Sequence, residues 1–372
     1  MGGGADDAPG AAVAQCVADI EVADFVALDL EFSGLFLSTE RDRRLLSLDE
    51  YFQKCVESIP QFLPLQLGVC CARRSSSSGA WELRSCEFNL WPQDRRIFAA
   101  DLQSLRFLRS HGFDFNAFFE KAHLYTRLAS IDDDKRPAQR LPPSHATHVV
   151  EALRKARVPL VFHNGLLDLL HLYDKFLGEL PDEREELGTA WTSNFPLLFD
   201  TRLIAQEGRY QILRHSGGLS LEELHRHLSS LPNVLLRFER TGPLGEGRSA
   251  HGSSGQDATV TAEVFLMEMD LWLRAEASSK RRKTASGKPA AGPEEGKPAA
   301  AALGSADDHD GWTVVGRKRP LQDCSTAAEA GEGGLLLPSL LESHNLCKRF
   351  HNKLAIVGAA PGWLDLGRPP GP

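Results

Sequence analysis

The sequence predicts an α/β fold, in which helices pack on a sheet. Short apolar runs typical of strands alternate along the chain with longer stretches in which apolar residues recur at helical spacing. The 372 residues, 42% hydrophobic and 25% charged, are enough for one large core and are ordinary for a globular protein. One folded domain with additional tails is therefore expected.

The individual elements follow from local patterns. Strands are predicted near residues 24–30, 64–72, 81–90, 158–163 and 197–200, where apolar runs are bounded by turn residues. Helices are predicted near residues 45–59, 101–110, 114–122, 146–156, 165–178 and 182–193, with a polar loop at 130–144. Ser220 is a suitable cap for a further helix, because Glu223 occupies the capping-box position. Asp257 opens a last helical stretch at 258–273.

Composition divides the chain into four parts. Residues 1–20 are small and predict a flexible N-terminus, which precedes a folded domain over residues 21–275. Residues 276–331 are rich in Ala, Gly, Pro, Ser and charge, and cannot bury enough apolar area to fold, so a disordered linker is predicted. Apolar runs within residues 332–372 predict a C-terminal segment that packs back onto the folded domain.

Several protein classes are excluded at this stage. No apolar stretch reaches membrane-spanning length, and the first residues lack the basic and apolar regions of a signal peptide. The seven cysteines show no Cys-x-x-Cys pair, so we expect reduced, buried thiols and not zinc ligands. The net charge of −8 does not indicate a nucleic-acid binder. Four consecutive basic residues, Lys280–Lys283, nevertheless predict a nuclear import signal within the linker.

The first predicted strand carries two acidic residues. Asp29 and Glu31 are two positions apart, so in an extended strand both carboxylates point to the same face. Two like charges on a core strand are costly unless a cation neutralises them, and a hard divalent ion with oxygen ligands is the simplest solution. The alternative is an edge strand whose acids are solvated. The pair therefore indicates a candidate metal site.

Three later residues extend this candidate site. Asp168 lies in the first turn of a helix that follows a strand and an Asn-Gly turn, and Asp257 lies at the start of the last helix. His251 precedes Asp257 by six positions. Taken singly, each acid is an ordinary helix N-terminal residue, and the histidine is an ordinary loop residue. Their order along the chain, after Asp29 and Glu31, favours a catalytic set.

This order resembles the DEDD superfamily of exonucleases. Two further stretches, Leu105–Leu108 and His111–Asn116, are similar to the poly(A)-specific ribonuclease branch, as is Asp29–Leu35. Pro159–Asp168 and the tail segment His351–Leu354 are most similar to the nuclear, Cajal-body branch of these enzymes. The resemblance covers about residues 20–275 plus this tail. It implies a ribonuclease H-like exonuclease fold with a mixed central sheet flanked by helices.

The resemblance also implies an activity. It points to a magnesium-dependent 3′-to-5′ exoribonuclease that removes adenosines from single-stranded RNA and trims small nuclear or other non-coding RNAs in the nucleus. Two Mg²⁺ ions, with Mn²⁺ as the alternative, are the implied cofactors. Asp29 is then the bridging ligand, Glu31 and Asp257 hold the ion nearer the nucleophile, and Asp168 helps to hold the other. His251 is the implied general base, since imidazole titrates near neutrality.

Residues near the two acidic motifs are the implied RNA contacts: Phe32, Ser33, Gly34, Leu35, His163 and Asn164. Phe32 is a candidate to stack on a base, with core packing as the alternative. Gly34 would let the backbone approach the sugar-phosphate chain closely. Asn164 either contacts the terminal nucleotide or only forms the turn.

One spacing departs from the family pattern. The family histidine lies five residues before the last aspartate, where this chain has Gly252, whereas His251 lies six before Asp257. The Gly-Ser-Ser-Gly stretch at 252–255 can loop out one residue, which keeps His251 as the expected base. The alternative is a catalytically impaired nuclease fold that acts as an RNA-binding or scaffold protein. The sequence leaves open whether the chain forms a homodimer.

Overall fold

The structure is a computed structural model of the chain. It describes residues 8–38, 44–128, 141–206, 218–231, 236–241, 253–285 and 345–367. Two compact units are distinguished, one formed by residues 1–272 and 335–372 and the other by residues 273–334. The fold and the candidate site described below belong to the first unit.

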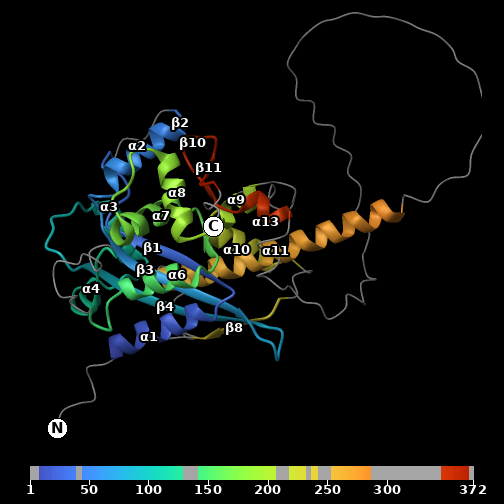
Figure 1. Cartoon of the computed structure of the whole chain (residues 1–372), viewed down its shortest axis with the longest axis horizontal. Helices are drawn as coiled ribbons and strands as arrows, with labels where there is room; N and C mark the ends of the chain where they lie inside the picture. Colours follow the sequence, from blue (N-terminus) through green and yellow to red (C-terminus); the bar gives the residue numbers. More distant parts are fainter. Residues whose placement is uncertain are drawn as a thin grey trace, which may run out of the picture. The chain divides into compact units, whose positions relative to one another are not determined.

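A mixed sheet forms the centre of the first unit (Figure 1). Its order is β5-β4-β3-β1-β6-β7, and β8 also pairs with β4. Strand β1 is antiparallel to β3 and parallel to β6, which is why the sheet is mixed. The bounds are β1 Phe25–Phe32, β3 Pro64–Arg74, β4 Trp81–Pro92, β5 His123–Tyr125, β6 Leu160–Phe162, β7 Leu198–Asp200 and β8 Phe238–Thr241. The predicted α/β fold class is confirmed.

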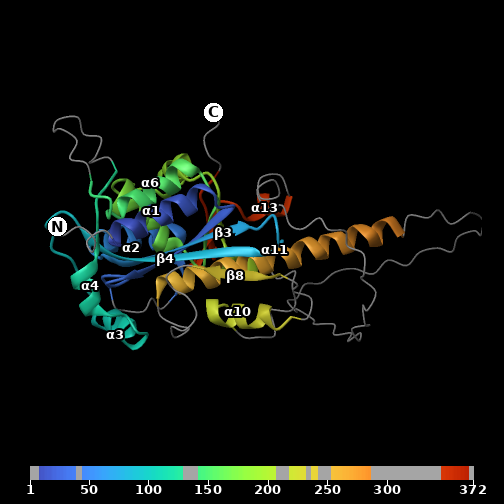
Figure 2. The same cartoon turned by 90° about the horizontal axis from the view of Figure 1, so that it is seen from below.

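Helices cover both faces of this sheet (Figure 2). Helices α1 (Ala8–Glu21) and α6 (Thr147–Ala156) lie on one face, and α10 (Leu221–Ser229) and the first part of α11 (Ser254–Ala285) lie on the other. Strand β1 contributes to both cores, because Val26 and Leu28 pack with the first set while Phe25 and Ala27 pack with α11. By this alternation, Asp29 and Glu31 belong to the face that α11 covers.

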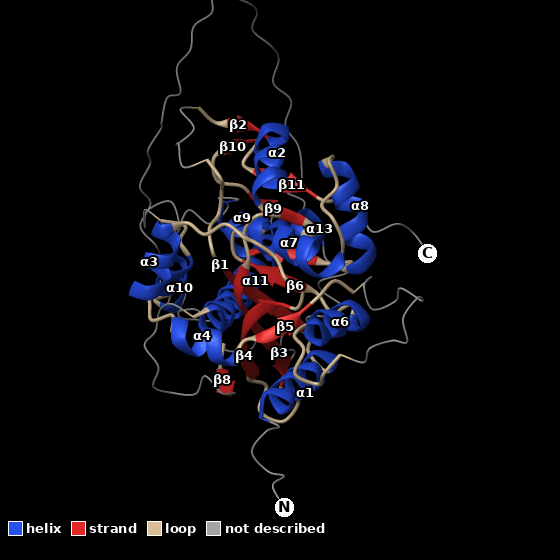
Figure 3. Cartoon of the chain, turned by 90° about the vertical axis from the view of Figure 1, so that its left-hand side faces the viewer, coloured by secondary structure: helices blue, strands red, loops and turns tan. Residues whose placement is uncertain are grey.

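The remaining elements surround the sheet (Figure 3). They are β2 Leu46–Ser47, α2 Leu48–Ser58, α3 Leu102–Ser110, α4 Phe115–Lys121, α7 Leu166–Leu172, a π-helix η1 Tyr173–Leu177, α8 Arg184–Asn194, α9 Thr201–Gln206, α13 Asn345–Phe350, β9 Lys353–Ala355, β10 Ala359–Ala360 and β11 Trp363–Asp365. Local caps explain several starts. Ser47 forms a capping box with Glu50, Asp101 caps α3, and the Ser220 hydroxyl accepts from the Glu223 N–H as expected.

The N-terminus differs from the expectation of a flexible segment over residues 1–20. Residues 8–21 form α1, whose Val13, Cys16 and Ile20 are buried in the main core. These three positions share one helical face, but several alanines and Gly10 surround them and weaken the apolar pattern. The expectation is therefore wrong for residues 8–20, whereas residues 1–7 lie outside the described part of the chain.

The last predicted helix is longer than its apolar pattern. Helix α11 continues to Ala285 and so includes the first ten residues assigned to the linker, 276–285. No glycine or proline interrupts this stretch before Gly287 and Pro289, so its residues keep good helix propensity after the apolar pattern has ended. Linker residues 286–331 lie outside the described residues.

Part of the C-terminal segment contacts the sheet. The Asn352 side chain accepts from the Leu198 N–H and donates to the carbonyls of Pro196 and Gly367. Strands β9 and β11 form an antiparallel pair next to it. Among the described residues, five cysteines are free and buried, as expected, and no helix is long and apolar enough to cross a membrane.

Candidate metal centre

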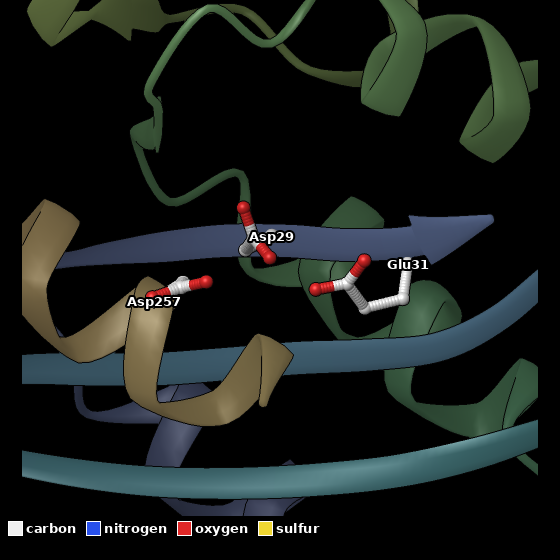
Figure 4. A group of neighbouring side chains, drawn as sticks. All are labelled: Asp29, Glu31 and Asp257. Atoms are coloured by element: carbon white, nitrogen blue, oxygen red, sulfur yellow. The ribbon is translucent and has the colours of Figure 1, made fainter. Parts of the chain in front are cut away.

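Three carboxylates converge beside the central sheet (Figure 4). Asp29 and Glu31 project from β1, and Asp257 projects toward them from the first turn of α11. Each offers one oxygen, and these oxygens all lie within 4.8 Å of one another. Within the described residues, no other group of three His, Cys, Asp or Glu side chains meets this criterion. The structure therefore brings together three of the four acids that the sequence selected as metal ligands.

Asp168 adjoins this group through the backbone of β1. One of its carboxylate oxygens accepts from the Leu30 N–H at 2.9 Å, and Leu30 lies between Asp29 and Glu31. The side chain is almost fully buried in the first turn of α7. Asp168 is therefore fixed against the same strand, and its negative charge acts on Asp29.

Two residues that sequence reasoning missed bring α11 to this strand. Gly68 lies opposite Asp29 on β3, and a Cβ atom there would be 1.9 Å from the Ser254 carbonyl oxygen. Only glycine permits this approach. The side-chain Oε1 of Gln66 accepts from both the Ser254 N–H and the Ser254 hydroxyl, which satisfies a free donor at the start of α11. A glycine within an otherwise apolar strand was the available signal for such a close contact.

The electrostatics of the group favour a bound cation. Burial, followed by repulsion from Asp257 and Asp168, raises the pKa of Glu31 to about 8. Burial and three neighbouring carboxylates raise the pKa of Asp29 well above its usual range, and burial raises that of Asp168 to about 7. At neutral pH these groups therefore resist ionisation together. Converging carboxylate oxygens are the donors that hard divalent ions prefer, so the residues fit magnesium or manganese.

His251, the expected general base, lies outside the described residues, as does Gly252. The structure describes Ser253 onward, where the carbonyl of Ser253 accepts from the Gln256 and Asp257 N–H groups. The proposed looping-out of one residue before Asp257 therefore stays a prediction.

A cavity of about 540 Å³ opens beside the acidic group. It is lined by Glu31, Phe32, Leu35, Asp101, Gln103, Ser104, Phe107 and Leu108. The register of β1 shifts between Glu31 and Phe32, and such irregularities re-aim side chains next to many active sites. The Phe32 ring stacks on the ring of buried His171, with 4.3 Å between the ring centroids. Phe32 therefore packs against the core as well as lining the cavity.

Two of the expected RNA contacts have structural roles. Ser33 is fully buried, and its hydroxyl donates to the Ala99 carbonyl and accepts from the Leu63 N–H. At Gly34, an added Cβ would lie 2.3 Å from the Phe62 ring. Packing against Phe62 therefore requires a glycine here, and the expected approach of a sugar-phosphate backbone to Gly34 stays a prediction. Phe32 and Leu35 are the members of this run that line the cavity.

The two candidates after β6 are also engaged within the protein. The ring nitrogens of His163 pair with the Thr201 hydroxyl at 2.8 Å and the Leu219 carbonyl at 3.1 Å. Burial lowers the pKa of His163 to about 4. Asn164 is exposed, adopts a left-handed φ of 58° and donates its N–H to Asp200. Of its two interpretations, forming the turn therefore has direct structural support.

Comparisons with known proteins identify the family of the chain. The profile described as CAF1 family ribonuclease matches residues 11–141 and 126–265, which is more than half of the chain. The mouse (Mus musculus) poly(A)-specific ribonuclease PNLDC1 is 23% identical over 363 residues, covering 68% of each chain. The zebrafish (Danio rerio) poly(A)-specific ribonuclease PARN is 31% identical over 128 residues, which are 32% of this chain but only 18% of that relative.

Among solved structures, S. pombe Pop2p in its Mg²⁺- and Mn²⁺-bound form has a TM-score of 0.45 at 18% identity. The match covers 69% of this chain and 87% of that chain. The family assignment depends on the sequence profile, whose two matched segments span the acids Asp29, Glu31, Asp168 and Asp257. By this match, the chain belongs to the CAF1 family of ribonucleases.

Proposed function

We propose that this protein is a magnesium-dependent 3′-to-5′ exoribonuclease that removes adenosines from the 3′ ends of RNA. The observation that carries the proposal is the convergence of Asp29, Glu31 and Asp257 within 4.8 Å in a ribonuclease-family fold. The names of relatives such as the mouse and zebrafish poly(A)-specific ribonucleases support adenosine-tailed RNA as the substrate class.

The resemblance to the DEDD exonucleases supplies the proposed role of each acid. Asp29, which offers an oxygen within 4.8 Å of those of Glu31 and Asp257, would be shared by two divalent ions. Glu31 and Asp257 would hold the ion nearer the nucleophile, and Asp168 would help to hold the other. When bound, such ions stabilise charge on the attacking and leaving oxygens of a phosphodiester. His251 would accept the proton of the attacking water.

The cavity beside Glu31 is the proposed subsite for the 3′-terminal nucleotide. Phe32, already packed on one face by His171, supplies an aromatic surface, and Phe107 is more than half exposed at the same cavity. Bases stack on aromatic rings with about 1–3 kcal/mol each. Such a subsite next to the carboxylates would hold the last base while its phosphodiester lies at the metal ions.

We further propose that the protein acts in the nucleus, as a member of the Cajal-body branch that trims small nuclear or other non-coding RNAs. Lys280–Lys283, which the structure places within the span of α11, is the proposed import signal. Recognition of this helical signal requires that an import receptor reach the four basic side chains. A homodimer is a further proposal, testable by light scattering.

The activity is tested with oligo(A) RNA labelled at either end. A 3′-to-5′ exonuclease converts the 5′-labelled RNA into a ladder, releases labelled mononucleotide at once from the 3′-labelled RNA, and stops when EDTA removes the metal. Asp29→Ala is the inactive control, and oligo(dA) tests whether the enzyme distinguishes RNA from DNA. RNA binding without any magnesium-dependent cleavage would instead support the scaffold alternative.

A further inference from the structure

Asp200, at the end of β7, is a buried carboxylate with an unusual number of donors. Asp200 is fully buried. Among the described residues, none of its hydrogen bonds is with Asp29, Glu31 or Asp257. Its two oxygens accept five backbone N–H groups, those of Asn164 (3.0 Å), Arg202 (2.9 Å), Leu203 (3.3 Å), Gly165 (3.2 Å) and Ala355 (3.1 Å). A carboxylate that accepts several N–H groups fixes the backbone segments that supply them.

Two of these donors belong to the turn that begins α7. Asn164 holds a left-handed φ of 58°, which costs energy for a residue with a side chain, and Asp200 stabilises it by accepting its N–H. Gly165 is the N-cap residue of α7, and a glycine has no side chain with which to cap the helix. One turn later, Asp168 accepts the Leu30 N–H between the two acids of β1. The turn held by Asp200 therefore sets where Asp168 meets the metal centre.

A third donor comes from the C-terminal segment. Ala355 in β9 is 155 positions from Asp200 in the sequence, and its N–H shares one carboxylate oxygen with Gly165. Asn352 anchors the same segment to β7 through the Leu198 N–H. Hydrogen bonds therefore join the C-terminal strand to the turn through Asp200, the backbone of residues 165–168 joins the turn to Asp168, and a hydrogen bond joins Asp168 to β1.

We propose that Asp200 is a positioning residue for the metal centre, and that strand β9 completes its support by occupying the second oxygen. This inference rests on the proposed function for the identity of the ligands, but it concerns how they are held. Residues that orient metal ligands without touching the metal typically change metal affinity by about 10–100-fold when replaced. We expect the lower end of this range, because Asp200 acts through the backbone.

The test measures Mn²⁺ binding to the RNA-free protein by electron paramagnetic resonance. Asp200→Asn keeps the size of the side chain but places an amide NH₂ against backbone N–H donors, so we expect Mn²⁺ binding to weaken about ten-fold. Glu268→Gln is the matched control. Glu268 is also a buried acid, and its charge interacts with that of Asp200. Within the described residues it has no hydrogen-bond partner and so does not hold the turn, and its exchange should leave Mn²⁺ affinity unchanged.

The Mg²⁺ dependence of hydrolysis separates positioning from general instability. Positioning predicts that Asp200→Asn needs about ten-fold more Mg²⁺ for half-maximal rate and recovers most of its kcat at saturation. A merely structural role would reduce the folded fraction and leave the Mg²⁺ midpoint unchanged. Wild-type Mn²⁺ affinity in a folded Asp200→Asn protein would overturn the proposal.

A second variant tests the C-terminal strand and remains informative if Asp200→Asn does not fold. Ala355→Pro removes one N–H donor and leaves the carboxylate in place. A single hydrogen bond is worth about 1 kcal/mol, which corresponds to about five-fold in affinity, so we expect Mn²⁺ binding to weaken two- to five-fold. Unchanged affinity would show that β9 does not support the site. If the wild-type protein binds Mn²⁺ but cleaves no RNA, the proposed function fails while these binding measurements still decide the role of Asp200.

Discussion

Gly68→Ala should damage the metal centre without touching any ligand. The new Cβ would lie 1.9 Å from the Ser254 carbonyl oxygen, 2.1 Å from its carbonyl carbon and 2.5 Å from the Gly255 nitrogen, whereas ordinary contacts begin at 3.4 Å. All three are backbone atoms, so no flexible side chain can move aside. The first turn of α11 must therefore retreat by about 1 Å or more, and Asp257 moves with it.

The loss follows from the precision that the site requires. A displacement of about 1 Å in a reacting group can cost roughly 100-fold in rate, so we expect kcat/KM on oligo(A) to fall by about that factor. Overpacking should also lower stability by about 1–3 kcal/mol, measured by urea unfolding. Gly178→Ala is the control, since nothing lies within 4 Å of its added Cβ. A Gly68→Ala enzyme with wild-type rate and stability would refute the packing argument.

Four further outcomes are expected. Asp29→Ala and Glu31→Ala should each abolish hydrolysis while circular dichroism shows an intact fold; full activity of both at saturating Mg²⁺ would exclude the metal assignment. In the metal-free protein, Glu31 holds a proton up to about pH 8, against an ordinary pKa of 4.5. The unfolded chain ionises Glu31 above about pH 4.5 while the folded protein keeps it protonated, so wild-type stability falls between these two pH values. Glu31→Gln cannot ionise and should be more stable than wild type by up to about 4 kcal/mol at pH 8 and by less than about 1 kcal/mol at pH 5, measured by urea unfolding. His251→Ala should slow hydrolysis at neutral pH by about two to four orders of magnitude with little change in RNA binding, measured by single-turnover kinetics and filter binding. Deleting Lys280–Lys283 should shift a fluorescent fusion toward the cytoplasm and leave activity in vitro unchanged; an unchanged nuclear signal would assign import to another segment.

The sequence was sufficient for elements whose signals are local. Apolar runs bounded by turn residues located β1 and β3, and a side-chain cap located α10. The acids could be selected because metal chemistry requires particular residue types, and Asp29 and Glu31 share a face by strand geometry alone. Helix α1 was missed because alanine and glycine dilute its apolar face, and the ends of α11 and of the apolar pattern do not coincide.

The supports of the site could not be predicted for a different reason. Gln66 and Ser254 are 188 positions apart, and Asp200 and Ala355 are 155 apart. In each case the acceptor side chain is visible in the sequence but its distant partner is not, because a backbone N–H that nearly every residue possesses is among the donors. Asp200 alone looks like an ordinary helix-start acid, and its N–H bonds from Arg202 and Leu203 fit that view. The folded chain also brings N–H groups of the turn before α7 and of strand β9 to the Asp200 carboxylate. Through these long-range hydrogen bonds, a residue that looks like a local helix cap supports the position of Asp168.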